Sequence, residues 1–172
     1  MDLYVYTDGS SKNNGKKNMI GGWAYLVLDG YGNMVDERYG AVKDATNNQM
    51  ELMAIMEFLK AVNTSKFSSI KIFTDSAYIA NCFKDKWYKK WERNNWITSS
   101  HTPVKNKEMW EWLIPYFELN KFTIEKVRGH ADDTYNNHVD DLAQGAADNC
   151  EKIKTFNIYW EENYASSSNT LF

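Results

Sequence analysis

Cysteine is scarce in this sequence, and two kinds of hydrophobic segment are absent from it. The 172 residues include two cysteines, Cys82 and Cys150, which cannot build a disulfide framework or a zinc motif. We therefore expect two free thiols. No stretch approaches the roughly 18 apolar residues of a membrane helix, and the first residues, MDLYVYTDGS, lack the basic start and apolar run of a signal peptide. A soluble cytoplasmic protein without membrane contact is expected.

The sequence also lacks the composition of a disordered chain and an overall positive charge. Hydrophobic residues make up 43% and charged residues 25%, as in a globular protein, and the length suits one domain. The net charge of -3 argues by itself against a nucleic-acid partner. Residues 84–107, however, hold seven Lys or Arg and two acids, a local charge of +5 that leaves -8 for the rest. This basic segment is the surface that a polyanion would contact.

Strand-like and helical patterns follow one another in a definite order along the chain. Strand patterns cover residues 3–8, 23–28 and 34–42, separated by a polar loop at 9–22 and a turn at 29–33. Helices are then predicted at 48–62, 76–83, 84–94, 107–119 and 136–150, with strands at 69–74 and 122–127. This order predicts an α/β fold with a five-stranded mixed sheet, an antiparallel meander followed by parallel strands.

The chain is predicted to form one domain with a terminal extension. Residues 1–154 would form the domain and residues 155–172 the extension. The Ser/Asn-rich segment ASSSNT at 165–170 is expected to be disordered, as chain ends often are.

Two of the predicted strands end in the same way. Asp8 is the last residue of the strand in YVYTDGS, and Asp75 directly follows the strand in KIFTDSA. Ligand sites in α/β sheets collect at the carboxyl ends of strands. An Asp after a strand can also simply open a turn, so each motif alone leaves both interpretations open.

Two further acids lie on helix faces that are predicted to be buried. Glu51 falls inside the apolar stripe of helix 48–62, and Asp140 lies at the shoulder of the stripe of helix 136–150, while Asp141 points to solvent. A buried acid is costly unless it is paired with a base or bound to a metal. Converging carboxylates persist when a divalent cation neutralises them, and oxygen ligands favour Mg²⁺ or Mn²⁺.

Five motifs together resemble the type 1 ribonuclease H family. They are TDGS at 7–10, TNNQMEL at 46–52, TDS at 74–76, PVKN at 103–106 and RGHA…N…VDDLA at 128–143. The resemblance runs from residue 3 to about residue 149. It implies the ribonuclease H-like fold with helices on both faces of the sheet. It also implies two-metal-ion hydrolysis of the RNA strand of RNA–DNA hybrids, which leaves 5′-phosphate and 3′-hydroxyl ends.

The resemblance also implies roles for the acids and for one histidine. Asp8 would bridge two Mg²⁺ ions, for which Mn²⁺ is a possible substitute. Asp140 would complete the site of the ion that activates the attacking water, and Glu51 and Asp75 would hold the ion at the leaving oxygen. His130 falls where the family has a mobile loop histidine that assists proton transfer or product release.

Nucleic-acid contacts are implied in the same way. Asn48 and Asn14 resemble residues that contact the minor groove of the hybrid, although the loop holding Asn14 is longer than usual. Thr46 and Asn106 would line a pocket for a phosphate of the DNA strand. Ala77 and Asp44 stand where the family commonly has Gln and Arg. These departures predict the loss of one nucleic-acid contact and weaker binding of the DNA-strand phosphate.

The basic segment resembles the substrate-binding protrusion of many family members. On a helix, one face would be cationic and its neighbour aromatic, a surface that tracks phosphates. A solvated basic helix with its Trp residues in the core is the alternative. Trp96 resembles a family aromatic near the DNA strand. The other predicted contacts on the helix are Lys86, Lys89, Lys90, Arg93 and Trp87.

A free-standing, monomeric enzyme is therefore predicted. One alternative is the ribonuclease H domain of a reverse transcriptase. Another is a non-catalytic hybrid-binding module, which would be expected to lack one or more of the four carboxylates.

Overall fold

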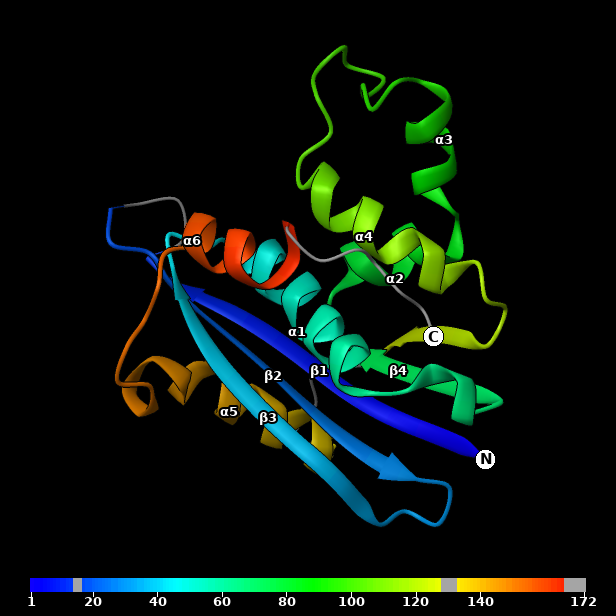
Figure 1. Cartoon of the computed structure of the whole chain (residues 1–172), viewed down its shortest axis with the longest axis vertical. Coiled ribbons are helices and arrows are strands. Elements are labelled where there is room, and N and C mark those ends of the chain that lie inside the picture. The colour runs from blue at the N-terminus through cyan, green and yellow to red at the C-terminus, as the bar shows by residue number, and fades with distance from the viewer. Residues whose placement is uncertain (14–16, 128–132, 166–172) are drawn as a thin grey trace.

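The computed structural model describes residues 1–13, 17–127 and 133–165, and Figure 1 shows their arrangement. Five strands form one sheet in the order β3-β2-β1-β4-β5. Neighbours β1–β2 and β2–β3 are antiparallel, and β1–β4 and β4–β5 are parallel. The predicted mixed sheet is thus confirmed. The strands are β1 (Asp2–Lys12), β2 (Ile20–Asp29), β3 (Met34–Lys43), β4 (Ser69–Thr74) and β5 (Phe122–Lys126).

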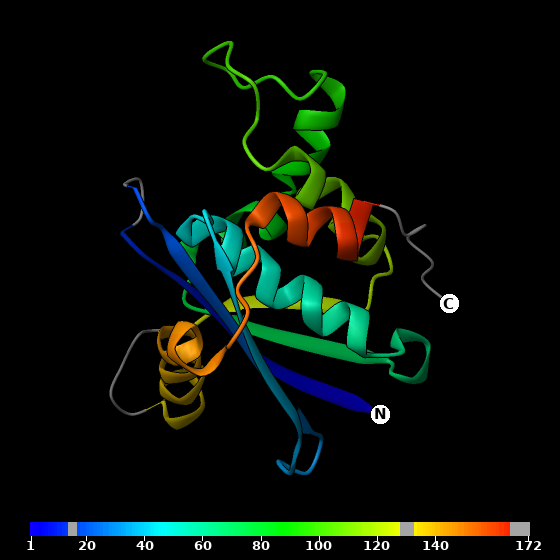
Figure 2. The ribbon, with the colours of Figure 1, turned by 60° about the vertical axis from the view of Figure 1, so that its left-hand side comes forward.

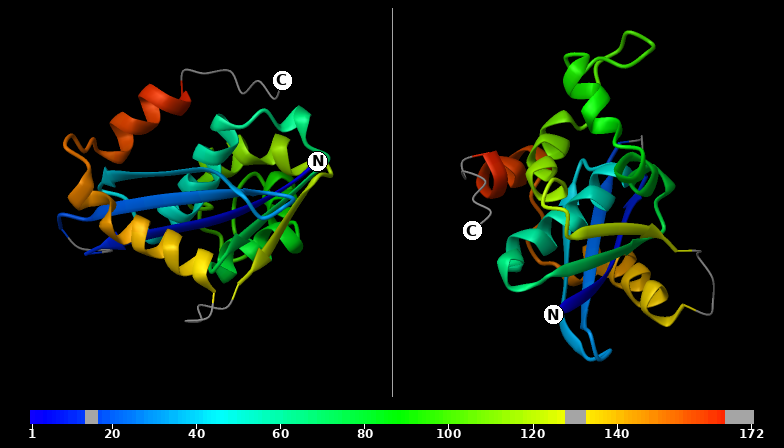
Figure 3. Two further views of the ribbon diagram at one scale, coloured as in Figure 1. Left: turned by 90° about the horizontal axis from the view of Figure 1, so that it is seen from below. Right: turned by 90° about the vertical axis from the view of Figure 1, so that its right-hand side faces the viewer.

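Helices cover both faces of the sheet, as predicted. Figures 2 and 3 show α1 and α5 on opposite sides of the strands. The larger core lies between the sheet and α1, α2 and α4, and a smaller core packs β2 against α5. The helices are α1 (Asn47–Ala61), α2 (Ala77–Lys84), α3 (Trp87–Arg93), α4 (Lys107–Phe117), α5 (Thr134–Asn149) and α6 (Phe156–Trp160), with a 3-10 turn at Thr64–Lys66 and a π-helical turn at Glu161–Ala165.

The predicted loop at 9–22 was too long, because both flanking strands continue into it. β1 runs on to Lys12, and β2 already begins at Ile20, so that Gly21 and Gly22 lie within a strand. A Cβ atom on Gly22 would lie 2.0 Å from the carbonyl oxygen of Ala143 in α5. Gly22 therefore allows α5 to approach the sheet closely. In the sequence alone, such glycines suggest a loop.

The predicted helix at 84–94 is shorter than expected. The helical conformation is interrupted after α2, because Lys86 adopts a left-handed backbone conformation with φ of 52°. α3 therefore starts only at Trp87. α3 and the loop after it project from the body of the molecule above α2 and α4 (Figure 1). The protrusion is thus a separate element that carries its cations away from the sheet.

The start of the predicted extension is folded. α6 and the turn that follows it pack on the outer side of α1, and Tyr164 is buried in the larger core. The backbone of Lys43 in β3 donates a hydrogen bond to the carbonyl of Lys154. Most of the segment predicted to be disordered, residues 166–170, lies outside the described residues. No helix in the described ranges combines the length and the apolar character needed to span a membrane.

Candidate active site

Three of the four predicted carboxylates meet at one point of the sheet. Asp8, Glu51 and Asp75 each present an oxygen atom, and these atoms all lie within 4.8 Å of one another. Asp8 is 3% exposed and Glu51 is 8% exposed. They come from β1, from the first turns of α1 and from the residue that follows β4. Residues that are 67 positions apart in the sequence thus form one oxygen cluster.

Asp8 reaches this cluster because it lies in the part of β1 that pairs with β2 alone. The parallel pairing of β1 with β4 ends at Tyr6 and Phe73. The antiparallel pairing with β2 continues through Asp8, which lies opposite Ala24. The prediction that the strand ends at Asp8 is therefore wrong, but the parallel ladder does end just before it. Asp75, one residue after β4, presents its oxygen to Asp8 just beyond the end of this ladder.

Glu51 lies beside Asp8 because α1 contacts the sheet at a glycine. A Cβ atom on Gly9 would lie 2.2 Å from the backbone carbon of Met50 and 2.3 Å from the backbone nitrogen of Glu51. The N–H of Gly9 donates a hydrogen bond to the Glu51 carboxylate. The Gly in the TDGS motif therefore permits the main-chain contact that sets the distance between these two acids.

The threonines of the two Thr-Asp motifs also support the cluster. Thr7 and Thr74 are both fully buried. The Thr7 hydroxyl donates to the carbonyl of Phe73 at 3.4 Å and ties β1 to β4. The Thr74 hydroxyl donates to the Glu51 carboxylate at 3.5 Å. These contacts were not predicted, although the Thr that precedes each Asp in the sequence is a signal for them.

The fourth carboxylate approaches from the other face of the sheet. Asp140 lies half-buried on α5, within hydrogen-bonding reach of Asp8, while Asp141 is exposed, as the helical pattern predicted. The Gln144 side-chain amide, one turn further on, donates to both Asp140 oxygens at 3.0 and 3.1 Å. This contact orients the Asp140 carboxylate, and the sequence analysis did not identify Gln144.

The electrostatics of the cluster favour a cation. Burial raises the pKa of Asp8 to about 10, with further contributions from the charges of Glu51 and Asp75. Burial and then the charge of Asp75 raise the pKa of Glu51 to about 8. Ionising both groups without a nearby positive charge is therefore unfavourable. A hard divalent cation would bind such an all-oxygen set and ionise it.

Comparison with known proteins identifies the family of this chain. Residues 1–148 match the family model for RNase H. A ribonuclease H of Clostridium botulinum is 42% identical over 146 residues, which cover 85% of this chain and 95% of that protein. The chain belongs to the ribonuclease H family. The predicted family and enzyme class, an endoribonuclease, are thus confirmed.

Two solved ribonuclease H1 structures share the fold. The enzyme from the archaeon Halobacterium salinarum superposes with a TM-score of 0.61 at 24% identity, covering 87% of this chain and 100% of that one. LC11-RNase H1, in complex with an RNA/DNA hybrid, superposes with a TM-score of 0.60 at 17% identity, covering 86% and 97%. At these identities the likeness concerns the fold, and the ribonuclease H-like fold class is confirmed.

Several residues that the ribonuclease H motifs singled out for substrate contact lie near the start of α1. Asn48 is exposed. Thr46 caps α1, because its hydroxyl accepts a hydrogen bond from the backbone N–H of Gln49 at 3.2 Å. Asn106 is half-buried just before α4, with a left-handed φ of 62°. Asn14 and His130 lie outside the described residues.

The predicted cations of the protrusion are all exposed, whereas its tryptophans are packed. Trp87 contacts Tyr78 with ring centroids 6.4 Å apart, and it is partly buried against the larger core. Trp96 packs on Trp91 at 6.0 Å, and Lys107 lies 5.9 Å from the centre of the Trp96 ring. The tryptophans therefore support the shape of the protrusion. The cations that reach solvent are Lys86, Lys89, Lys90 and Arg93.

Proposed function

We propose that this member of the ribonuclease H family hydrolyses the RNA strand of RNA–DNA hybrids in a two-metal-ion reaction. Products with 5′-phosphate and 3′-hydroxyl ends are part of the proposal. The observation that carries it is the oxygen cluster formed by Asp8, Glu51 and Asp75, with Asp140 beside it. A solved relative by fold was captured with an RNA/DNA hybrid, which supports this substrate class.

The four carboxylates are proposed to hold two Mg²⁺ ions, with Mn²⁺ as a possible substitute. Asp8 would serve both positions, since its side chain is within hydrogen-bonding reach of Asp140 and also belongs to the oxygen cluster with Glu51 and Asp75. When bound, such ions supply Lewis-acid stabilisation of the attacking and leaving oxygens in an in-line displacement. The Thr74 hydroxyl contacts the Glu51 carboxylate, and the Gln144 amide holds that of Asp140.

Selection of a hybrid is proposed to depend on the start of α1. Asn48 is exposed three residues before Glu51, where it can contact a ribose 2′-hydroxyl of a strand that enters the carboxylate cluster. Thr46, Asn106 and Asn14 are proposed to contact the hybrid, and His130 to assist proton transfer or product release. The exposed cations of α3, together with Trp87 and Trp96, are proposed to form the protrusion's binding surface.

The domain boundaries also belong to this proposal. Residues 1–154 would form the catalytic domain and residues 155–172 an extension, a division supported by the family match, which ends at residue 148. A monomeric state and a cytoplasmic location stay predictions from the sequence.

A cleavage assay with one labelled strand tests the proposal. It compares an RNA–DNA hybrid, duplex RNA, single-stranded RNA and duplex DNA, each with Mg²⁺ and with excess chelator. We expect cutting of the RNA strand of the hybrid alone, and only with the ion. Equal cutting of duplex DNA, or undiminished activity in chelator, would contradict it. Asp8→Asn should reduce the rate to less than about a tenth while hybrid affinity stays within a few-fold.

A further inference from the structure

A cavity of about 450 Å³ lies where the C-terminal segment meets the substrate-binding side of the domain. Three parts of the chain form it: the start of α1, the start of α4, and the segment 156–161. The last of these lies beyond the family match, which ends at residue 148. Its walls are formed by Gln49, Asn106, Glu108, Phe156, Trp160 and Glu161.

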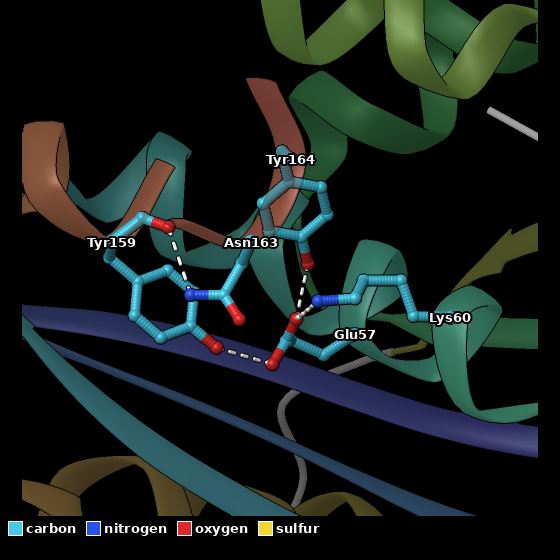
Figure 4. A network of polar contacts seen from close by, with 5 residues as sticks. All are labelled: Glu57, Lys60, Tyr159, Asn163 and Tyr164. Carbon is cyan, nitrogen blue, oxygen red and sulfur yellow. Dashed lines mark hydrogen bonds and ion pairs between the residues drawn. The ribbon is translucent and has the colours of Figure 1, made fainter. Parts of the chain in front are cut away.

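The C-terminal wall of the cavity is anchored to α1 by a network around Glu57 (Figure 4). The hydroxyls of Tyr159 and Tyr164 donate to the two oxygens of the Glu57 carboxylate, which is 12% exposed. Lys60 lies 3.6 Å from that carboxylate and 4.5 Å from the centre of the Tyr164 ring. Burial and the charge of Glu57 raise the pKa of both tyrosines, so they stay protonated donors. The wall is therefore held in place by contacts within the chain.

One side of the cavity is aromatic. Phe156 and Trp160 stack with ring centroids 6.1 Å apart and planes 20° apart. Trp160 stacks in turn on Tyr164 at 5.1 Å. Phe156 and Trp160 are each half-buried, so part of their ring surface stays accessible. Accessible flat rings of this kind stack nucleobases without demanding one base.

The polar side of the cavity suits the edge of a base better than a phosphate. Glu108 and Glu161 bring two carboxylates, which accept hydrogen bonds from base amino groups such as that of cytosine and repel phosphate. The Gln49 side-chain oxygen accepts from the backbone of Thr46 at 3.0 Å, which leaves its amide N–H groups as donors. The set thus offers both acceptors and donors to a base edge.

Two lysines adjoin Asn106, a wall residue of the cavity, in the sequence. Lys105 and Lys107 are exposed on either side of Asn106, the residue that we proposed as a DNA-strand contact. A nucleotide placed here would keep its phosphate near the lysines while its base enters the cavity. Aromatic and acidic side chains in the cavity suit the base of a nucleotide, and the lysines next to Asn106 suit its phosphate.

We propose that this cavity binds an unpaired nucleobase of the DNA strand, at the point where the DNA continues beyond the hybrid as a single strand. A base within a duplex has its edge paired and its faces stacked, so only an unpaired base can enter. The proposal rests on the proposed function, because the hybrid brings the DNA strand to Asn106. The C-terminal segment would then recognise the junction between hybrid and single-stranded DNA.

Binding measurements with the full-length chain test this proposal. In chelator, where the hybrid is expected to stay intact, fluorescence anisotropy compares a blunt hybrid with hybrids carrying four deoxycytidines at either DNA end. A third set carries the same extensions as abasic residues, which keep the phosphates and remove the bases. We expect one of the two extended hybrids to bind about tenfold more tightly than its abasic counterpart. Trp160→Ala should reduce this difference to less than about twofold and leave blunt-hybrid affinity unchanged.

Two further variants serve as a control and as an independent change to the cavity. Tyr31→Ala removes a 93% exposed aromatic ring in the β2–β3 hairpin, away from the cavity residues, and should keep the tenfold difference. Glu108→Ala changes the cavity from α4 without touching the C-terminal segment, so it covers the case in which Trp160→Ala unfolds that segment. The wild type should bind cytosine extensions more tightly than thymine extensions, because carboxylates accept from the cytosine amino group, and Glu108→Ala should abolish this preference.

Equal affinities for base-bearing and abasic extensions at both ends would overturn the proposal, and so would equal losses in Trp160→Ala and Tyr31→Ala. Trp160-dependent binding of an arginine-rich peptide, without binding of the extension, would assign the cavity to a protein partner instead. Cleavage of the blunt hybrid separates the two hypotheses. If the blunt hybrid is cut but the base-dependent gain is absent, only the cavity proposal fails.

Discussion

Replacing Asp8 by Asn should stabilise the metal-free protein, and increasingly so as the pH rises. The unfolded Asp8 has a pKa of about 3.9, whereas burial and the charges of Glu51 and Asp75 raise its pKa to about 10 in the folded protein. The folded state therefore binds a proton that the unfolded state has released. This stabilising contribution is complete below about pH 4 and is lost as the pH rises through the folded pKa. Asn does not titrate, so the variant avoids this loss.

The pKa difference sets the expected size of the effect. Each pH unit between the two pKa values costs the wild type about 1.4 kcal/mol of unfolding free energy, which gives a ceiling of about 4 kcal/mol between pH 5 and pH 8. Because Asp8 and Glu51 share the protons of one cluster, we expect about half of that, about 2 kcal/mol. For a chain of 172 residues, this corresponds to a Tm difference of about 4–8 °C.

Thermal unfolding followed by circular dichroism at pH 5 and pH 8, with chelator present, measures this difference. The Tm advantage of Asp8→Asn over the wild type should grow by that amount from pH 5 to pH 8. Saturating Mg²⁺ should reduce the Tm advantage of the variant, because the ion stabilises the ionised wild type. Asp141→Asn is the matched control, since Asp141 is exposed, and its Tm difference should stay constant. A Tm advantage that does not change between pH 5 and pH 8 would refute the electrostatic argument.

Three other variants test separate parts of the structure. Asp140→Asn should lower kcat at least about 100-fold in the hybrid assay, whereas Asp141→Asn should stay within about twofold; the reverse order would contradict the assigned face of α5. Changing the four α3 cations to Ala should raise KM and make the salt dependence of affinity shallower by about two units, with kcat nearly unchanged; an unchanged KM and slope would mean that they are merely solvated. Glu57→Leu should lower the unfolding free energy by about 1–3 kcal/mol, because the hydroxyls of the buried Tyr164 and the half-buried Tyr159 lose their acceptor; an unchanged Tm would show that the network adds no stability. The four cations changed to Ala in the second of these tests are Lys86, Lys89, Lys90 and Arg93.

The order of strands and helices could be predicted from the sequence because it depends on local periodicity. Alternating residues marked the strands, and the apolar stripe of α1 correctly placed Glu51 on a buried face. The same phase argument separated Asp140 from the exposed Asp141. The extent of β1 and β2 was not predictable, because Gly9, Gly21 and Gly22 suggest a loop unless the helices that touch them are known.

Much of the site depends on contacts between distant parts of the chain, which local patterns do not encode. The hydrogen bond from Thr74 to Glu51 spans 23 residues. The two tyrosines that fix the C-terminal segment reach Glu57 across 102 and 107 residues. The roles of Asn14 and His130 came from family motifs alone, and they stay predictions.

The contact at Gly9 makes the metal site sensitive to a residue that binds no metal. The distance between Asp8 and Glu51 is set by two main chains that touch where Gly9 has only a hydrogen atom. Main chains cannot rotate aside as flexible side chains do, so even alanine at position 9 would push α1 outward and carry Glu51 with it. Ion affinity could therefore be lost with all four ligands intact, and a relative that lacks this glycine would need a different spacing of its carboxylates.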